Sequence, residues 1–206
     1  DDAVANGLRI LGPDVNASEY RFTPVDRSTI RYGLGAVKGT GEQAVNAILK
    51  VREAGGAFKD LFDFCRRADK RLVNRRTIEA LIRAGAFDSL DKHRARLLAS
   101  VGIAMEAAEQ AERNAMQVSL FDIFDAADSG GEQGPRYVDV PPWSERQKLN
   151  EEKLALGFYF SGHPFHGVQA EVSRFVGRPL AALEARKETQ LLAGLVVGVR
   201  SKFTAR

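Results

Sequence analysis

The sequence predicts a mainly α-helical protein. Apolar residues recur at helical spacing in separate stretches at 45–49, 58–65, 78–82 and 97–108. Glycine follows several of these stretches, as is common where helices end. Only 191–199 is rich in the branched residues typical of a β-strand. We therefore expect a helical domain followed by the start of a β-structure.

Length and composition indicate a globular protein with one large domain or two small ones. Of the 206 residues, 44% are hydrophobic and 28% are charged. No apolar run approaches the roughly 20 residues needed to cross a bilayer, and no signal pattern opens the sequence, so we expect a cytoplasmic protein without a membrane partner. The single cysteine, Cys65, lies among apolar residues and is predicted to be a core thiol.

The net charge of +3 is unevenly distributed along the chain. Residues 30–100 contain 15 Lys and Arg against 8 Asp and Glu, whereas residues 101–160 contain 5 against 11. A basic half is typical of nucleic-acid binding, and an acidic half would be repelled by phosphate. The two halves are therefore predicted to have different roles.

A glycine-containing turn at 37–41 organises the basic half. The sequence predicts that it leads into a helix ended by Gly55-Gly56, and that both of its glycines take torsions that a Cβ would forbid. Free N–H groups at a helix start, with a lysine beside them, form a phosphate site. The pattern resembles the helix-hairpin-helix module, which binds nucleic-acid backbone without reading bases; a turn that only joins two helices is the alternative. The DNA-binding residues predicted here are Lys38, Gly39, Thr40 and Gly41.

A second, degenerate copy of this turn follows. Asn74 can cap a helix over 75–83 that Gly85 ends, and Asp88 stands where the module would have its second glycine. Two such units in tandem would clamp the backbone of duplex DNA. A solvated basic helix start is the alternative. The DNA-binding residues predicted here are Gly85, Lys92, Arg94 and Arg96, with His93 among them.

A long alanine-rich helix is expected to end near residue 115, before a Gly- and Asp-rich linker at 125–141. An apolar pair at the edge of such a linker has little of its own domain to pack against, which is typical of a partner-binding peptide. The pentamer at 117–121 resembles the bacterial sliding-clamp binding motif. Its predicted clamp-binding residues are Gln117, which would hydrogen-bond, Ser119, and Leu120 and Phe121, which would fill an apolar pocket.

Beyond the linker, the residues from Ser144 to Gln147 form a capping box for a helix that Gly157 should end. A short strand is possible at 20–22 near the start of the chain. The strand at 192–199 has no partner strand in these residues, so we expect it to be unpaired.

The sequence predicts no catalytic or metal site. Phosphoryl transfer needs carboxylates that converge on metal ions, and zinc needs about four ligands. The candidate pairs lack further partners, so the carboxylates are interpreted as solvated charges, and no phosphate-binding P-loop is present. These pairs are Asp60 with Asp63, Asp122 with Asp125, and His163 with His166.

Five ordered blocks resemble the alpha subunits of bacterial DNA polymerase III, the C family of replicative polymerases. They are 12–18, 30–39, 84–88, 117–121 and 156–164. The resemblance covers essentially the whole chain. It implies the end of the fingers region at 1–30, a tandem helix-hairpin-helix and clamp-binding domain at 31–124, the linker at 125–141, a helical connector at 142–188, and the first strand of a truncated OB-fold at 189–206.

The resemblance implies a non-catalytic part of a DNA-directed DNA polymerase, a nucleotidyltransferase. Its partners would be primer-template duplex DNA, the sliding clamp, and the rest of the alpha chain and holoenzyme. Tethering to the clamp would make DNA replication processive through a high effective concentration. No cofactor is expected here, because Mg²⁺ would be bound in the palm domain, outside these residues. The alternatives are the helix-hairpin-helix part of a DNA repair nuclease or ligase, and an interaction scaffold without DNA affinity.

Overall fold

The computed structural model describes residues 6–121, 136–178, 182–185, 187–196 and 199–201; the side chains of 116–121 lie outside the described ones. These residues are mainly helical, as predicted, with one small sheet. The chain divides into two compact units, residues 1–160 (unit 1) and residues 161–206 (unit 2). No helix in the described parts is both long and apolar enough to span a membrane.

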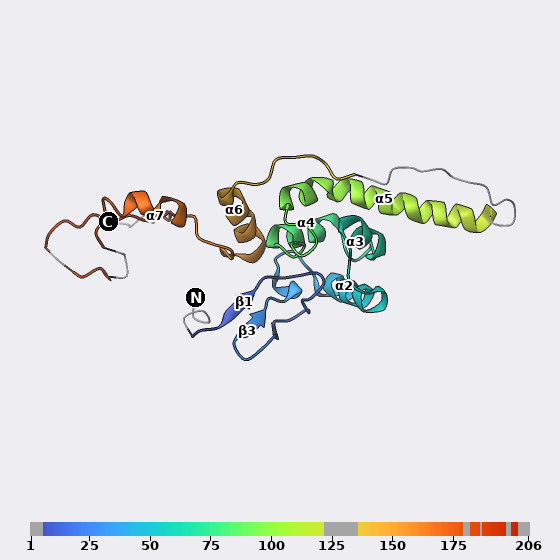
Figure 1. Ribbon diagram of the computed structural model, residues 1–206, viewed down its shortest axis with the longest axis horizontal. Coiled ribbons are helices and arrows are strands. Elements are labelled where there is room, and N and C mark those ends of the chain that lie inside the picture. The colour runs from blue at the N-terminus through green and yellow to red at the C-terminus, as the bar shows by residue number, and fades with distance from the viewer. Residues whose placement is uncertain (1–5, 122–135, 179–181, 186, 197–198, 202–206) are drawn as a thin grey trace. The chain divides into compact units, whose positions relative to one another are not determined.

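The sheet of unit 1 has three short strands, β1 (Arg9–Leu11), β2 (Thr23–Pro24) and β3 (Thr29–Arg31). The order is β1-β3-β2, with β1 parallel and β2 antiparallel to β3 (Figure 1). The short strand expected at 20–22 is not formed at those residues. The strand β2 begins one residue after them, at Thr23. After β3 the chain passes through one 3-10 turn to the first hairpin.

Helices make up the rest of unit 1. Their bounds are the 3-10 helix η1 (Leu34–Ala36), α2 (Glu42–Gly55), α3 (Leu61–Arg67), α4 (Arg75–Ala84), α5 (Arg94–Phe121) and α6 (Glu145–Leu156). Helices α4 and α6 begin at the capping residues that the sequence predicted. Asn74 Oδ1 accepts the Thr77 N–H at 3.0 Å at the start of α4, and Ser144 Oγ accepts the Gln147 N–H at 3.2 Å at the start of α6. Gly157, with φ +93°, ends α6 as expected.

Three phenylalanines form the aromatic centre of the core. The ring of Phe64 lies 4.8 Å from that of Phe58 and 4.9 Å from that of Phe87, centroid to centroid, and all three are buried. Cys65 lies beside them. Burial raises the pKa of its thiol to about 12, which confirms the prediction of a core thiol.

Asp63, expected to be a solvated charge, is instead buried at 8% exposure. Its carboxylate accepts hydrogen bonds from the Lys59 N–H at 3.1 Å, from Arg66 at 2.8 Å and from Arg67 at 3.1 Å. Burial alone would raise the pKa of Asp63, but these donors outweigh it and lower the pKa. Asp63 therefore stabilises α3. The other candidate carboxylates, Asp122 and Asp125, lie outside the described residues.

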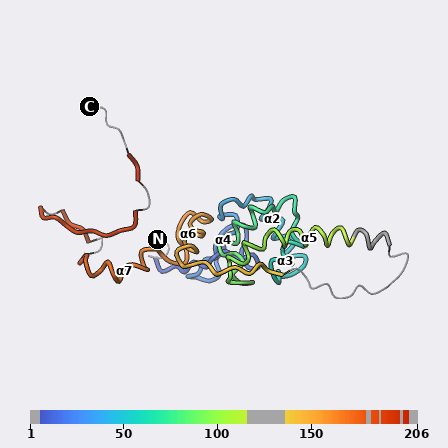
Figure 2. Tube along the Cα trace, turned by 90° about the horizontal axis from the view of Figure 1, so that it is seen from above, coloured from blue at the N-terminus to red at the C-terminus, as the bar shows by residue number. Residues whose placement is uncertain are grey.

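The described end of the expected linker is packed. Residues 136–143 run back along α5 (Figure 1, Figure 2). The ring of Tyr137 lies 5.0 Å from that of Phe62, and the Val138 N–H donates to Ser100 Oγ at 2.9 Å. These contacts hold the returning chain against α3 and α5.

Helix α6 packs against α4 (Figure 2). The guanidinium of Arg83 on α4 and the carboxylate of Glu151 on α6 form an ion pair at 2.9 Å. Residues 142–160 are grouped with the hairpins in unit 1.

Unit 2 contains one short helix, α7 (His166–Val172), among its described residues. The strand predicted at 192–199 is not formed there, since residues 191–196 and 199–201 carry no strand assignment. A strand needs a neighbour for its backbone hydrogen bonds, and the described part of unit 2 offers none. The branched side chains are exposed accordingly, Val196 at 78% and Val199 at 86%.

Candidate nucleic-acid interface

The first hairpin, residues 37–41, joins η1 to α2. Gly39 has a left-handed φ of +87°, which favours glycine as the sequence predicted. Gly41 has an ordinary extended backbone, φ −79°, and no atom lies within 4 Å of the position of a Cβ. The expectation that both glycines are required was therefore wrong at Gly41, because the residue that caps a helix takes torsions open to any residue.

Backbone amides are available at this hairpin. The Thr40 hydroxyl donates within the turn, to the carbonyl oxygens of Val37 at 2.7 Å and Leu34 at 2.8 Å, and so fixes its shape. The N–H groups of Gly39 and Gly41 make no hydrogen bond to any residue that the structure describes. Free amides at the positive end of the α2 dipole suit a phosphate.

Lys38 is exposed at the edge of the same turn. Its backbone N–H donates to the carbonyl oxygen of Ala155 on α6 at 2.8 Å. Its ammonium lies over the end of α6, where a Cβ on Gly157 would be 2.8 Å from Nζ. The last carbonyls of a helix attract a cation, so the end of α6 favours the Lys38 ammonium in this position.

The second hairpin, residues 85–93, joins α4 to α5 and begins with Gly85, whose φ is +85°. Arg94, predicted to contact DNA, is only 7% exposed and lies inside the protein. It donates to Asp88 Oδ1 and Oδ2 at 2.7 and 2.6 Å, and to Glu152 Oε1 at 2.9 Å. Burial alone would lower the pKa of Arg94, but the two carboxylates outweigh it and raise the pKa. Arg94 is therefore an internal counter-ion.

The other predicted residues at the second hairpin differ in whether a protein group already binds them. Arg96 donates to Asp91 Oδ2 at 2.6 Å, and its guanidinium lies 5.2 Å from the ring centroid of Tyr137. His93 Nδ1 accepts the Arg96 N–H at 3.0 Å and caps α5. Lys92 is exposed, with no ion pair to any residue in the described ranges. Of the predicted basic residues here, Lys92 is the one presented outward without a carboxylate partner.

Helix α6 contributes contacts that sequence reasoning missed. Glu152 is fully buried, and its carboxylate accepts from Arg94 through Oε1 and from the Phe160 N–H through Oε2 at 3.2 Å. The backbone of Ala155 meets the first hairpin. The same helix therefore contacts both hairpins. No local signal marks this arrangement, because Arg94 and Glu152 are 58 residues apart in sequence.

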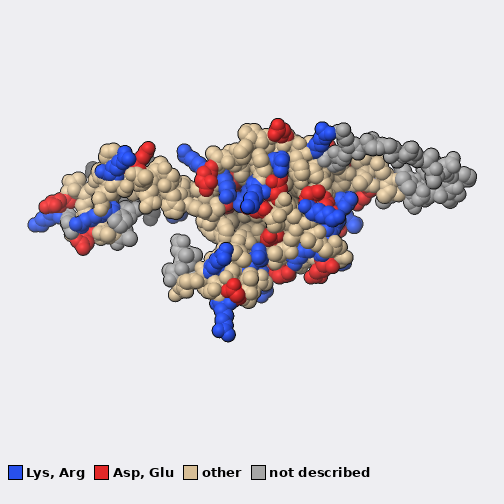
Figure 3. Space-filling view, viewed as in Figure 1, with Lys and Arg blue, Asp and Glu red and all other residues tan. Residues whose placement is uncertain are grey.

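The surface charge around α6 is mixed. On the face drawn in Figure 3, Lys and Arg gather over α6 and the adjoining end of α4, with Asp and Glu next to them. Phosphate contacts would therefore be local, made where a basic group has no acidic neighbour. Gln117, Ser119, Leu120 and Phe121, the predicted clamp-binding residues, fall in the last turns of α5, where side chains lie outside the described ones.

The family model for the helix-hairpin-helix motif matches residues 7–97, which include both hairpins. Two turns with a left-handed glycine, each leading into a helix, agree with that match and define the class of domain. The whole chain is also similar to "DNA polymerase III subunit alpha" of Neisseria meningitidis serogroup A (48% identity), Vibrio cholerae (42%) and Escherichia coli K12 (40%). Over its whole length this chain is therefore similar to one part of the DNA polymerase III alpha subunits. In each case the alignment covers all of this chain and 18% of the relative.

Proposed function

We propose that this chain binds the backbone of duplex DNA as a non-catalytic part of a replicative DNA polymerase alpha subunit. The first hairpin carries the proposal, because the free amides of Gly39 and Gly41 lie at the start of α2 and the same turn carries the exposed Lys38. The proposal needs no cofactor in these residues. The names of the relatives favour a DNA-directed DNA polymerase as the parent over a repair nuclease or ligase.

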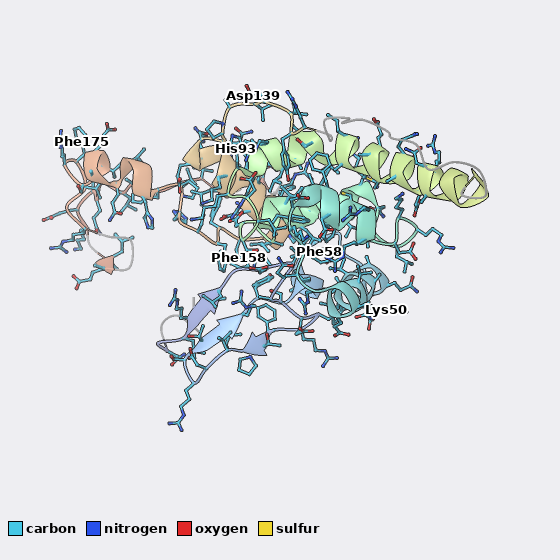
Figure 4. All side chains as sticks on the ribbon, turned by 45° about the vertical axis from the view of Figure 1, so that its right-hand side comes forward. Lys50, Phe58, His93, Asp139, Phe158 and Phe175 are labelled. Carbon is cyan, nitrogen blue, oxygen red and sulfur yellow. The ribbon has the colours of Figure 1, made fainter. Side chains whose placement is uncertain are left out.

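The test is duplex binding by Lys38→Ala across a range of salt concentrations. Loss of one phosphate contact should weaken binding alike for all sequences and lower the salt slope by about 1. Lys50→Ala is the matched control, since Lys50 is an exposed lysine midway along α2 (Figure 4). Equal slopes for both variants and the parent would mean that the hairpin is only structural. A parent without salt-dependent DNA binding would favour the scaffold alternative.

We also propose that residues 117–121 bind the bacterial sliding clamp. The support is the resemblance of the pentamer to the clamp-binding motif and its place in the last turns of α5. Burying Leu120 and Phe121 in a pocket could contribute on the order of 5 kcal/mol, partly offset by ordering the peptide. Such a tether would keep the polymerase near the primer end through effective concentration.

Clamp titrations test this second proposal. Leu120→Ala combined with Phe121→Ala should lower clamp affinity about a hundredfold or more, on the order of 3 kcal/mol. Gln117→Ala should cost about 1 kcal/mol, one hydrogen bond. The double variant should melt at the temperature of the parent. If it unfolds the domain, the two side chains belong to the core and the clamp proposal loses its basis.

The exposed side chains near the end of unit 2 support a further proposal, that 189–206 supplies the first strand of an OB-fold. Leu191 at 69% and Val196 at 78% exposure would gain a cover if neighbouring strands were present. Amide hydrogen exchange at 192–199 should then be slow in the longer alpha chain and fast in the 206-residue chain. Equal exchange in both would remove the proposal.

A further inference from the structure

A small basic pocket lies where the start of α5 meets the stretch that leads into α6. Its volume is about 70 Å³. Part of its wall comes from the second hairpin and part from residues about 50 positions later, beyond the helix-hairpin-helix match that ends at 97. Its principal lining residues are Lys92, His93, Ala95, Pro142, Trp143 and Lys148.

The pocket presents donors that no protein group uses. The side chains of Lys92 and Lys148 form no ion pair or hydrogen bond with any residue that the structure describes. His93 Nδ1 accepts the Arg96 N–H at 3.0 Å, so neutral His93 carries its proton on Nε2. Two lysines and one histidine with such donors therefore line the same small space.

Three carboxylates of the second hairpin and α6 are engaged by groups other than these lysines. Asp91 accepts the His93 N–H at 2.8 Å and the Arg96 guanidinium at 2.6 Å. Asp88 and Glu152 are both held by Arg94. None of the three pairs with Lys92 or Lys148, and two ammonium groups at one pocket favour an anion with several acceptor oxygens.

The pocket is small, and its size suits one compact anionic group such as the charged oxygens of a single phosphodiester. Trp143 adds an apolar wall against which a sugar can pack. We infer that this pocket binds one backbone phosphate of duplex DNA, and that Lys148 and Trp143 are DNA-binding residues together with Lys92. This inference rests on the proposed function.

The experiment compares Lys92→Ala/Lys148→Ala with the parent chain in duplex binding across salt. The double variant should lose about 1 from the salt slope, because the pocket would hold one phosphate and each phosphate contact contributes about 0.9. Lys50→Ala/Lys59→Ala is the charge-matched control, since both lysines are exposed and lie outside the pocket. Thermal melting confirms that each variant is folded.

Trp143 supplies an independent measurement, because it is the single tryptophan of the chain. Duplex DNA should change its fluorescence in the parent and in the control but much less in Lys92→Ala/Lys148→Ala. If the parent does not bind duplex, the proposed function itself fails. If the parent binds and Lys38→Ala lowers the slope, but the pocket variant keeps the parent slope and fluorescence response, the pocket inference is overturned and the proposed function stands.

Discussion

The two hairpins of unit 1 share a backbone turn and differ in the side chains around it. Gly39 and Gly85 have nearly the same left-handed φ, +87° and +85°. A Cβ on Gly39 would lie 3.9 Å from Ala80 Cβ, an ordinary contact, whereas a Cβ on Gly85 would collide with the Arg94 guanidinium. The first hairpin leaves amides and Lys38 at the surface, and the second directs its arginine inward to two carboxylates. The same turn can therefore serve as a ligand site or support a buried ion pair.

Arg94→Ala should give the largest effect of any change at either hairpin. It would leave Glu152, fully buried, without its counter-ion, and breaking a buried pair in this way costs about 3–5 kcal/mol. Urea unfolding measures the loss. Arg96→Ala is the control, because the Arg96 side chain is 41% exposed and its pair with Asp91 should contribute about 1 kcal/mol or less. Similar losses for both variants would mean that the buried ion pairs of Arg94 stabilise the fold no more than the surface pair of Arg96 does.

Replacing each left-handed glycine with alanine separates the cost of the turn itself from the cost of moving Arg94. Both substitutions place a Cβ on a left-handed backbone, which costs about 1–2 kcal/mol. Gly85→Ala must also displace Arg94 from Asp88, so its loss of unfolding free energy should exceed that of Gly39→Ala. Equal losses would show that Arg94 can move without cost and that its ion pair with Asp88 does not stabilise the second hairpin.

The elements fixed by neighbouring residues could be predicted from the sequence. The caps at Asn74 and Ser144 and the left-handed ends at Gly85 and Gly157 depend on groups within a few positions, so their signals are local. Likewise, the first hairpin has a recognisable pattern at 37–41.

The position of α6 and the burial of Arg94 could not be predicted in this way. Both depend on Glu152, which meets Arg94 only after the chain has returned along α5. A basic residue after a turn has the same local pattern whether it faces solvent or a distant carboxylate. The pattern also misled at Gly41, since the second glycine of the turn is a helix cap with ordinary torsions.

Gly41→Ala should therefore have little effect, in contrast to Gly39→Ala. Its backbone is extended and the space for a Cβ is open, and loss of glycine restricts the unfolded chain, which can stabilise by about 0.4–1 kcal/mol. Part of this gain is offset because alanine is a poorer helix cap than glycine. Duplex affinity should be retained because the amide remains. Destabilisation as large as that of Gly39→Ala would mean that both glycines are required after all.

The smallest expected effect is a pH dependence confined to the second hairpin. Burial alone would raise the pKa of Asp91, but the His93 N–H and the Arg96 guanidinium outweigh it and lower the pKa from 3.8. A carboxyl whose folded-state pKa is lowered stabilises the fold fully above its unfolded value and loses that contribution as the pH falls through the folded value. Asp91→Asn should therefore lose less unfolding free energy than the parent between pH 6 and pH 3, by about 1 kcal/mol or less.

Urea unfolding at both pH values measures this difference, and an NMR titration of the Asp91 carboxyl reports the pKa directly. The first hairpin has no carboxylate in residues 37–41, so acid should loosen the start of α5 before it alters the turn before α2. Amide exchange at low pH can follow both sites in one sample. If the Asp91→Asn variant shows the same acid sensitivity as the parent, the bonds to His93 and Arg96 do not stabilise this hairpin. The two turns would then differ only in the buried pair between Arg94 and its carboxylates.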